Sequence, residues 1–163
     1  CHIPLLISAG KNVLPEIKSS SVCHGVAELR DIMPALLEIA GTEIPASVDG
    51  HSLLPLAKDP GSTARTWLHG EHSYGEFSNH WIVTETDKYI WYSETGEEQY
   101  FCLKEDPHEL INRIGDAGCQ DRIKELRGHL IDSLKGRLEG FTDGSVLITG
   151  RPYLPTLPSA TEA

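Results

Sequence analysis

The sequence has no apolar run of the roughly 18 to 20 residues that a membrane-spanning helix needs. It also has no basic start followed by an apolar stretch, as a signal peptide would have, and no N-x-S/T sequon. Basic residues are few, because 14 Lys and Arg stand against 24 Asp and Glu, for a formal net charge of −10. This charge repels phosphate backbones and anionic lipid headgroups. The sequence therefore predicts neither nucleic acid nor a membrane as partner, whereas a small anion in a local pocket stays compatible.

The common catalytic motifs are missing as well. The chain has no G-x-S-x-G nucleophile elbow, no G-x-G-x-x-G or G-x-x-x-x-G-K-[ST] phosphate loop and no H-E-x-x-H zinc motif. Its four cysteines, Cys1, Cys23, Cys102 and Cys119, form no CxxC pair and have no metal-ligand spacing. We expect buried or unpaired thiols, with a disulfide as the alternative. Taken alone, these residues indicate an acidic α+β chain without a complete active site.

The first part of the chain opens at CHIPLLISAG, without a methionine, turn or cap, which suggests a piece of a larger protein. Residues 3–8 (IPLLIS) predict a strand buried on both faces. A helix should follow Asp31 as its N-cap, with Pro34 in the first turn and Gly41 as the C′ residue. One face of this helix should pack on a core through Ile32, Leu36, Ile39 and Ala40.

The second part of the chain is rich in short aromatic and β-branched segments separated by turn signals. They predict an antiparallel meander of four strands at residues 67–73, 80–85, 88–93 and 99–103. Asp106-Pro107-His108-Glu109 resembles a helix cap, with Asp106 at N-cap and Glu109 at N3. A helix with a buried stripe should then cover one face of the sheet, through Ile123, Leu126, Leu130, Ile131 and Leu134.

The sequence also suggests a boundary near residues 59–64 (DPGSTA). Residues 1–58 are then a piece of a larger α/β core, and residues 59–163 a small subdomain of sheet and helix. After about residue 140 the chain becomes rich in Pro and Gly, and we expect an extended tail, above all over residues 151–163.

The densest polar cluster is His69-Gly70-Glu71-His72 with Asn79-His80. In a strand, alternation places His69 and Glu71 on one face and His72 on the other. Three interpretations stay open at this point. In the first, which the spacing favours least, the side chains bind a metal. In the second, they form hydrogen bonds at a strand end. In the third, they lie at the mouth of a loop and contact a ligand that another domain holds.

Five segments in order carry a resemblance to a known family: IPLLIS, ELRDIMPALLEIAG, IPASVDGHSLLPL, LHGEH and KYIWYSETGEEQYFCLKEDPHELIN. Together they resemble the C-terminal part of a bacterial sulfatase of the arylsulfatase type, over residues 3 to about 155. The resemblance implies the alkaline-phosphatase superfamily fold, an α/β domain followed by a smaller four-stranded antiparallel sheet with a helix. Residues 1–58 would end the large domain and pack on the missing N-terminal part.

The resemblance also implies a cofactor set. Such sulfatases use a formylglycine, made from Cys or Ser in a C/S-x-P-x-R motif, beside a divalent cation that is usually calcium. Both are expected upstream, so no catalytic residue and no metal ligand is assigned to this chain, and the chain alone should have no sulfatase activity. Cys102 is followed by Leu103-Lys104-Glu105-Asp106, so it does not match the motif. It stands where the family pattern LFDLxxDPxExxN has Asp, which should cost one polar contact.

The part that this chain can play in such an enzyme is substrate selection at the cleft rim. The candidates are His69, His72, Asn79 and His80, with Glu71 orienting a histidine. The substrate would be a small aryl or sugar sulfate, and the compartment, cytoplasmic or periplasmic, stays open. Alternatives are a phosphodiesterase or phosphonate hydrolase of the same superfamily, or a non-catalytic binding module.

Overall fold

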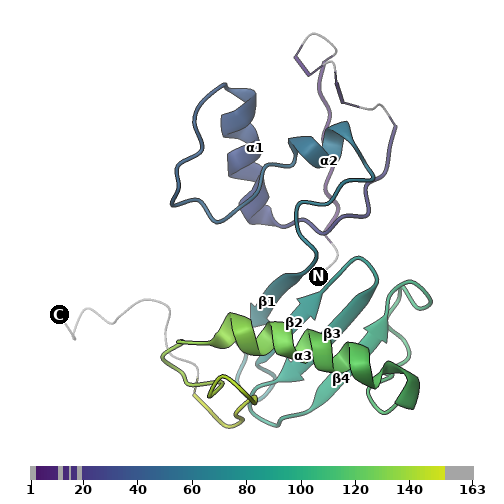
Figure 1. Cartoon of the computed structure of the whole chain (residues 1–163), viewed down its shortest axis with the longest axis vertical. Coiled ribbons are helices and arrows are strands. Elements are labelled where there is room, and N and C mark those ends of the chain that lie inside the picture. Colours follow the sequence, from purple (N-terminus) through teal and green to yellow (C-terminus); the bar gives the residue numbers. More distant parts are fainter. Residues whose placement is uncertain (1–2, 11–12, 15, 18–19, 153–163) are drawn as a thin grey trace, which may run out of the picture. The chain divides into compact units, whose positions relative to one another are not determined.

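A computed structural model describes residues 3–10, 13–14, 16–17 and 20–152 of the chain (Figure 1). The chain divides into two compact units, Cys1–Leu68 and His69–Ala163. This division falls ten residues after residue 58, where the sequence suggested the end of the first part of the chain. The expected tail at residues 151–163 lies, apart from its first two residues, outside the described part. None of the described helices is both long and apolar enough to cross a membrane.

The first unit holds short helices and a small core. A 3-10 turn η1 (Leu29–Asp31) leads into α1 (Ile32–Ile39), and α2 (Leu54–Lys58) follows. As predicted, Pro34 lies in the first turn of α1, and Gly41 ends it with a φ of 67°. The core gathers Ala35, Leu53 and Leu56, with Cys23, Ala27 and Ala64 packed against it.

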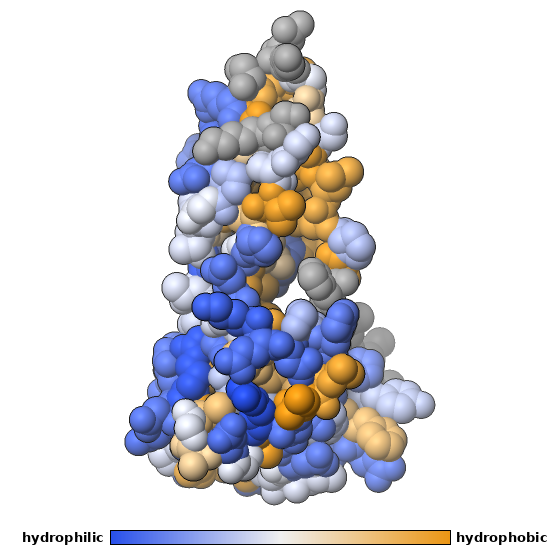
Figure 2. Space-filling view, turned by 90° about the vertical axis from the view of Figure 1, so that its right-hand side faces the viewer, coloured by the Kyte–Doolittle hydropathy of each residue, from blue (hydrophilic) through white to orange (hydrophobic). Residues whose placement is uncertain are grey.

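Two predictions for this unit were wrong. Residues 3–8 form no strand, and in the described part of the chain no segment pairs with them, so a strand buried on both faces has no neighbours here. The expected core face of α1 is also turned outward: Leu36 is 61% exposed, and Ile32, Ile39 and Ala40 are exposed too. The helix instead buries Pro34 and Ala35, and Ala35 belongs to the small core with Leu53 and Leu56. Figure 2 shows apolar side chains gathered over this unit.

Asp31 occupies the N-cap position of α1, yet its carboxylate does not cap that helix. It accepts the backbone N–H of Glu28 at 2.8 Å and of His51 at 2.9 Å. The guanidinium of Arg65 donates to both carboxylate oxygens, at 2.6 and 2.7 Å. Burial raises the pKa of Asp31, but these hydrogen bonds outweigh it and hold the pKa below its usual range. A carboxylate that is only 1% exposed therefore joins three segments of the unit.

The second unit is built on the predicted four-stranded antiparallel sheet. Its strands are β1 (Leu68–His72), β2 (Asn79–Val83), β3 (Asp87–Tyr92) and β4 (Glu98–Cys102), in the order β1-β2-β3-β4. In the register, Trp81 lies opposite Ile90 and Tyr89 lies opposite Tyr100. Each strand starts and ends within two residues of its prediction, because the turn signals between the strands are strong.

Helix α3 (Gln120–Leu134) covers one face of this sheet (Figure 1). Its five predicted core positions are all buried, and so are Ile82, Tyr89 and Trp91 of the sheet. Two ion pairs add to the apolar contacts: Arg122 of α3 donates to Asp87, and Arg127 donates to both oxygens of Glu98. The stripe at helical spacing thus does what the sequence predicted.

The segment after β4 differs from the prediction. Asp106-Pro107 does not start a helix, because Glu109 has a left-handed φ of 56°, which breaks helical geometry. The Asp106 carboxylate accepts the N–H of Ile111 at 2.8 Å, and Lys88 donates to Glu109 at 2.7 Å. The helix begins only at Gln120, after the 3-10 turn η2 (Ala117–Cys119).

Residues 141–150 also do not run as an extended tail. Phe141 is fully buried, and Thr142 pairs with Leu147 in an isolated bridge. The N–H of Gly150 donates to the carbonyl of Ser93 at 2.9 Å. This return to the sheet places Phe141 beside the polar cluster of β1 and β2.

Candidate functional site

The polar cluster lies on β1 and β2, whose local sequence explains its form. Alternation along β1 turns His69 and Glu71 to one face, as predicted. Gly70 lies between them on the opposite face, where an added Cβ would lie 2.2 Å from the ring of Trp81. Only glycine therefore allows this strand to lie so close to the indole of β2.

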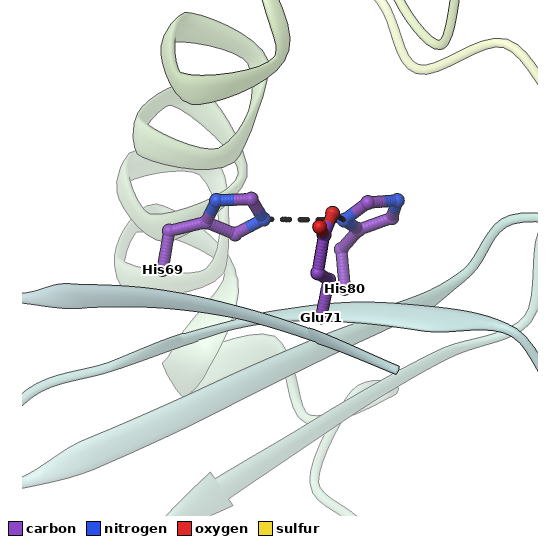
Figure 3. Close-up of side chains that lie close together, drawn as sticks. All are labelled: His69, Glu71 and His80. Carbon is purple, nitrogen blue, oxygen red and sulfur yellow. Dashed lines mark hydrogen bonds and ion pairs between the residues drawn. The ribbon is translucent and has the colours of Figure 1, made fainter. Parts of the chain in front are cut away.

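Three side chains of the cluster point toward one another (Figure 3). His69 Nε2 and His80 Nδ1 are 3.1 Å apart, at hydrogen-bond distance, and Glu71 Oε2 lies 3.4 Å from the same His80 nitrogen. Residues 69 and 80 thus meet from two neighbouring strands, although 11 positions separate them in the sequence.

His80 is the buried member of this group. It has no exposed surface, and its ring stacks on Trp91 at 5.8 Å and meets the edge of Phe141 at 5.0 Å between centroids. Burial, followed by the charges of His69 and Arg137, lowers the pKa of His80 to about 3. The imidazole is therefore neutral near neutral pH, and its aromatic neighbours hold its plane.

Sequence reasoning missed three members of the surroundings, which are Arg137, Glu139 and Phe141. Arg137 donates to Glu71 at 2.5 Å and to Glu139 at 2.8 Å, and its guanidinium lies 5.7 Å from the centre of the Phe141 ring. Arg137 follows Glu71 by 66 positions, and no short motif links them. Only the packing of the chain after α3 brings this cation to the cluster.

The other two candidate residues lie apart from this group. His72 is exposed, and its ring stacks on Tyr74 at 6.1 Å, while Tyr74 in turn stacks on Phe77 at 6.3 Å. The side-chain amide of Asn79 donates to the carbonyl of Phe77 at 2.8 Å, so it closes the β1–β2 loop. A role of any of the four residues in substrate binding stays a prediction.

The second unit is thus a four-stranded antiparallel sheet covered by one helix, and a unit of short helices precedes it in the chain. The family model described as "N-sulphoglucosamine sulphohydrolase, C-terminal" matches residues 1–136. The chain therefore belongs to this family, as its motifs predicted.

Individual relatives agree with the family assignment. The chain is 50% identical over 151 residues to an arylsulfatase of Clostridium perfringens, a match that covers 93% of this chain but 31% of the relative. A protein solved in complex with its substrate D-glucosamine-2-N,6-O-disulfate matches with a TM-score of 0.58 and 27% identity, over 64% of this chain and 23% of that one. The chain thus spans a third or less of the length of these relatives.

A more distant structure shares only the fold. The phosphonate monoester hydrolase of Silicibacter pomeroyi matches with a TM-score of 0.60 over 85% of this chain and 32% of that one, at 17% identity. The fold of this region therefore also occurs in a hydrolase of phosphonate monoesters.

The cofactors general to sulfatases, formylglycine and calcium, do not fit the residues described here. Cys102, at the end of β4 opposite Asp87, is a half-buried thiol without the C-x-P-x-R sequence after it. Cys23 and Cys119 are unpaired thiols as well, and they also lack the motif. Calcium takes oxygen ligands, whereas two of the three donors of the β1–β2 cluster are imidazole nitrogens.

Proposed function

We propose that this chain completes a sulfatase that hydrolyses sulfate esters of small sugars or aryl alcohols. The supporting observation is the 50% identity to an arylsulfatase across nearly the whole chain. The structural match to a protein that binds a disulfated glucosamine as its substrate favours a sugar sulfate. The formylglycine and the calcium ion belong, in this proposal, to a region upstream of residue 1.

Activity measurements on two polypeptides test this proposal. The longer protein that carries this chain should hydrolyse an aryl sulfate and a sulfated glucosamine, while the 163-residue chain alone should hydrolyse neither. Turnover by the pure chain would contradict the proposal that the catalytic residues lie upstream of residue 1. A longer protein that cleaves only phosphonate or phosphate esters would instead support the superfamily alternative, and one that binds sulfated sugars without cleaving them would indicate a binding module.

The exposed apolar surface of the first unit is consistent with this arrangement. Eleven of the large hydrophobic residues exposed in the described chain belong to residues 3–39, including Leu6 at 89% and Leu36 at 61%. An apolar patch of this extent marks an interface. Its partner, in our proposal, is the N-terminal part of the same protein.

We place His72 at the rim of the substrate cleft. It is exposed at the end of β1, beside the exposed rings of Tyr74 and Phe77, and such a surface offers sugar rings both hydrogen bonds and stacking. In the longer protein, His72→Ala should raise KM or change the preference among sulfated sugars, with kcat little changed. Unchanged kinetics across several substrates would leave His72 a structural role only.

A further inference from the structure

The donor atoms of His69, Glu71 and His80 have the spacing of a metal site. All three lie within 4.8 Å of one another, and two of the separations are 3.1 and 3.4 Å. Zinc binds imidazole nitrogen and carboxylate oxygen at about 2.0–2.2 Å, so neighbouring ligands of a tetrahedral ion lie about 3.3 Å apart. A small movement of side chains on one face of a sheet would therefore complete three corners of a tetrahedron.

The surroundings of these atoms suit a cation that prefers nitrogen. His80 is fully buried, and its Nδ1 lies 3.1 Å from His69 Nε2 and 3.4 Å from Glu71 Oε2. Trp91 and Phe141 hold its ring, so Nδ1 keeps its direction toward the other two donors. Ligands fixed in this way lose little freedom on binding.

The charge around the cluster does not oppose a cation overall. Arg137 contacts Glu71, and its positive charge alone would weaken metal binding. The same guanidinium also pairs with Glu139, so two carboxylates stand against one arginine. An outer partner that holds a ligating carboxylate in place is a common feature of metal sites.

We propose that His69, Glu71 and His80 bind a divalent transition-metal ion of the zinc type, with one coordination position open to water or to an anionic oxygen. Two histidines and one carboxylate form a known zinc ligand set with an open position. Calcium and magnesium are disfavoured because both prefer oxygen ligands. The inference does not depend on the proposed activity.

Cobalt titration of the 163-residue chain tests the site without any activity measurement. After treatment with a chelator, the chain should bind one Co²⁺ with the intense visible absorption of a tetrahedral complex. Zn²⁺ should displace the cobalt, while an excess of Ca²⁺ or Mg²⁺ should not. Binding should weaken on acidification, because protonated imidazoles do not ligate metals.

Substitutions at the two more accessible ligands identify the site. His69→Gln and Glu71→Gln should each lower the Co²⁺ affinity at least about tenfold, with an unchanged far-ultraviolet circular dichroism spectrum. His72→Gln is the matched control, since it removes an imidazole from the same strand but from the opposite face. It should leave the affinity unchanged. Variants of His80 are less useful because that ring belongs to the core.

Several outcomes would overturn the proposal. A folded chain that binds no Co²⁺ saturably would mean that His69 and His80 only share a hydrogen bond. Equal loss of affinity in His72→Gln and His69→Gln would show non-specific binding by surface imidazoles. A sulfur-to-cobalt charge-transfer band would place the ion on cysteine thiols instead.

Discussion

The two units differ in how far their apolar side chains are buried. In the second unit, the stripe of α3 is completely covered by the sheet, and Leu126 and Leu130 have no exposed surface. In the first unit, an equally regular stripe on α1 points outward, and Leu36 is 61% exposed. The same helical pattern therefore produces a closed core in one unit and an open apolar surface in the other. The comparison teaches that an apolar stripe at helical spacing does not by itself determine burial, because burial also depends on the surface that packs against the helix.

The units also differ in their buried charges. The second unit links sheet and helix through two arginine–carboxylate pairs, Arg122 with Asp87 and Arg127 with Glu98. The first unit relies on one such group, Asp31 with Arg65, to join segments far apart in sequence. We expect the first unit to depend more heavily on a single residue.

The largest expected effect is the loss of this group. Asp31→Ala leaves Arg65 and two backbone N–H groups without their buried acceptor, which should destabilise the first unit by about 3–5 kcal/mol. Hydrogen exchange measured by mass spectrometry over residues 28–65 would detect the change. Arg30→Ala is the control, since it removes an exposed ion pair with Glu28 and should change little. Equal exchange in both variants would refute the importance of Asp31.

A pair of leucine variants tests the contrast between the two stripes. Leu126→Ala should destabilise the second unit by about 2–5 kcal/mol, because it opens a cavity in a closed core. Leu36→Ala should change stability by less than about 0.5 kcal/mol. Urea unfolding followed by fluorescence suits the first variant, in a Trp67→Phe background that leaves the two tryptophans of the second unit, Trp81 and Trp91. Similar losses in both variants would show that the stripes are equivalent.

Acidification should weaken the second unit through Asp87. Burial raises the pKa of Asp87, but hydrogen bonds from Tyr100, Thr86 and Arg122 outweigh it, so the pKa lies below its usual range. The stabilisation is therefore present above the unfolded-state pKa of about 3.9 and is lost as the pH falls through the folded-state value. The urea concentration at the midpoint of unfolding should therefore decrease as the pH is lowered through this acidic range.

Asp87→Asn is the matching variant for this titration. The amide keeps the size of the side chain but cannot ionise, so the second unit should be less stable at neutral pH and its midpoint should depend less on acidic pH. A wild-type profile that does not change below pH 4, or an unchanged slope in the variant, would contradict the assignment to Asp87.

The smallest effect on stability should come from placing a charge on the exposed apolar face of α1. Leu36→Lys should change the unfolding free energy by less than about 0.5 kcal/mol, since the side chain is exposed in this chain. It should nevertheless reduce concentration-dependent self-association in sedimentation velocity, because it interrupts the apolar patch. In the longer protein, the same substitution should be clearly destabilising. If it is harmless there, the patch is not covered by the N-terminal part.

Local signals predicted the second unit well. Turns such as Thr86-Asp87 and Glu94-Thr95-Gly96 separate alternating strands, and the spacing from Ile123 to Leu134 is helical, so neighbours in sequence already define each element. The failures arose where distant contacts decide. Asp106 has the sequence of a cap but binds Ile111 instead, and Glu109 turns toward Lys88 on β3.

The candidate site shows the same division. Strand alternation predicted that His69 and Glu71 share a face, and the family motifs singled out the segment. No pattern in the sequence indicated that His80 would lie between them and the buried rings of Trp91 and Phe141, or that Arg137 would pair with Glu71. These contacts depend on strand register and on the return of residues 141–150 to the sheet.

The sequence by itself determined the family, the order of the strands along the chain, the helix that covers them and the acidic charge. The family follows from the resemblance of the five segments, and the other features follow from the periodicity, turns and composition of short segments, which need no knowledge of distant residues. The tertiary structure alone decided which stripe is covered, which carboxylate binds which arginine and which donors converge at His69, Glu71 and His80. These features require residues up to 66 positions apart to meet, and only the packed chain brings them together.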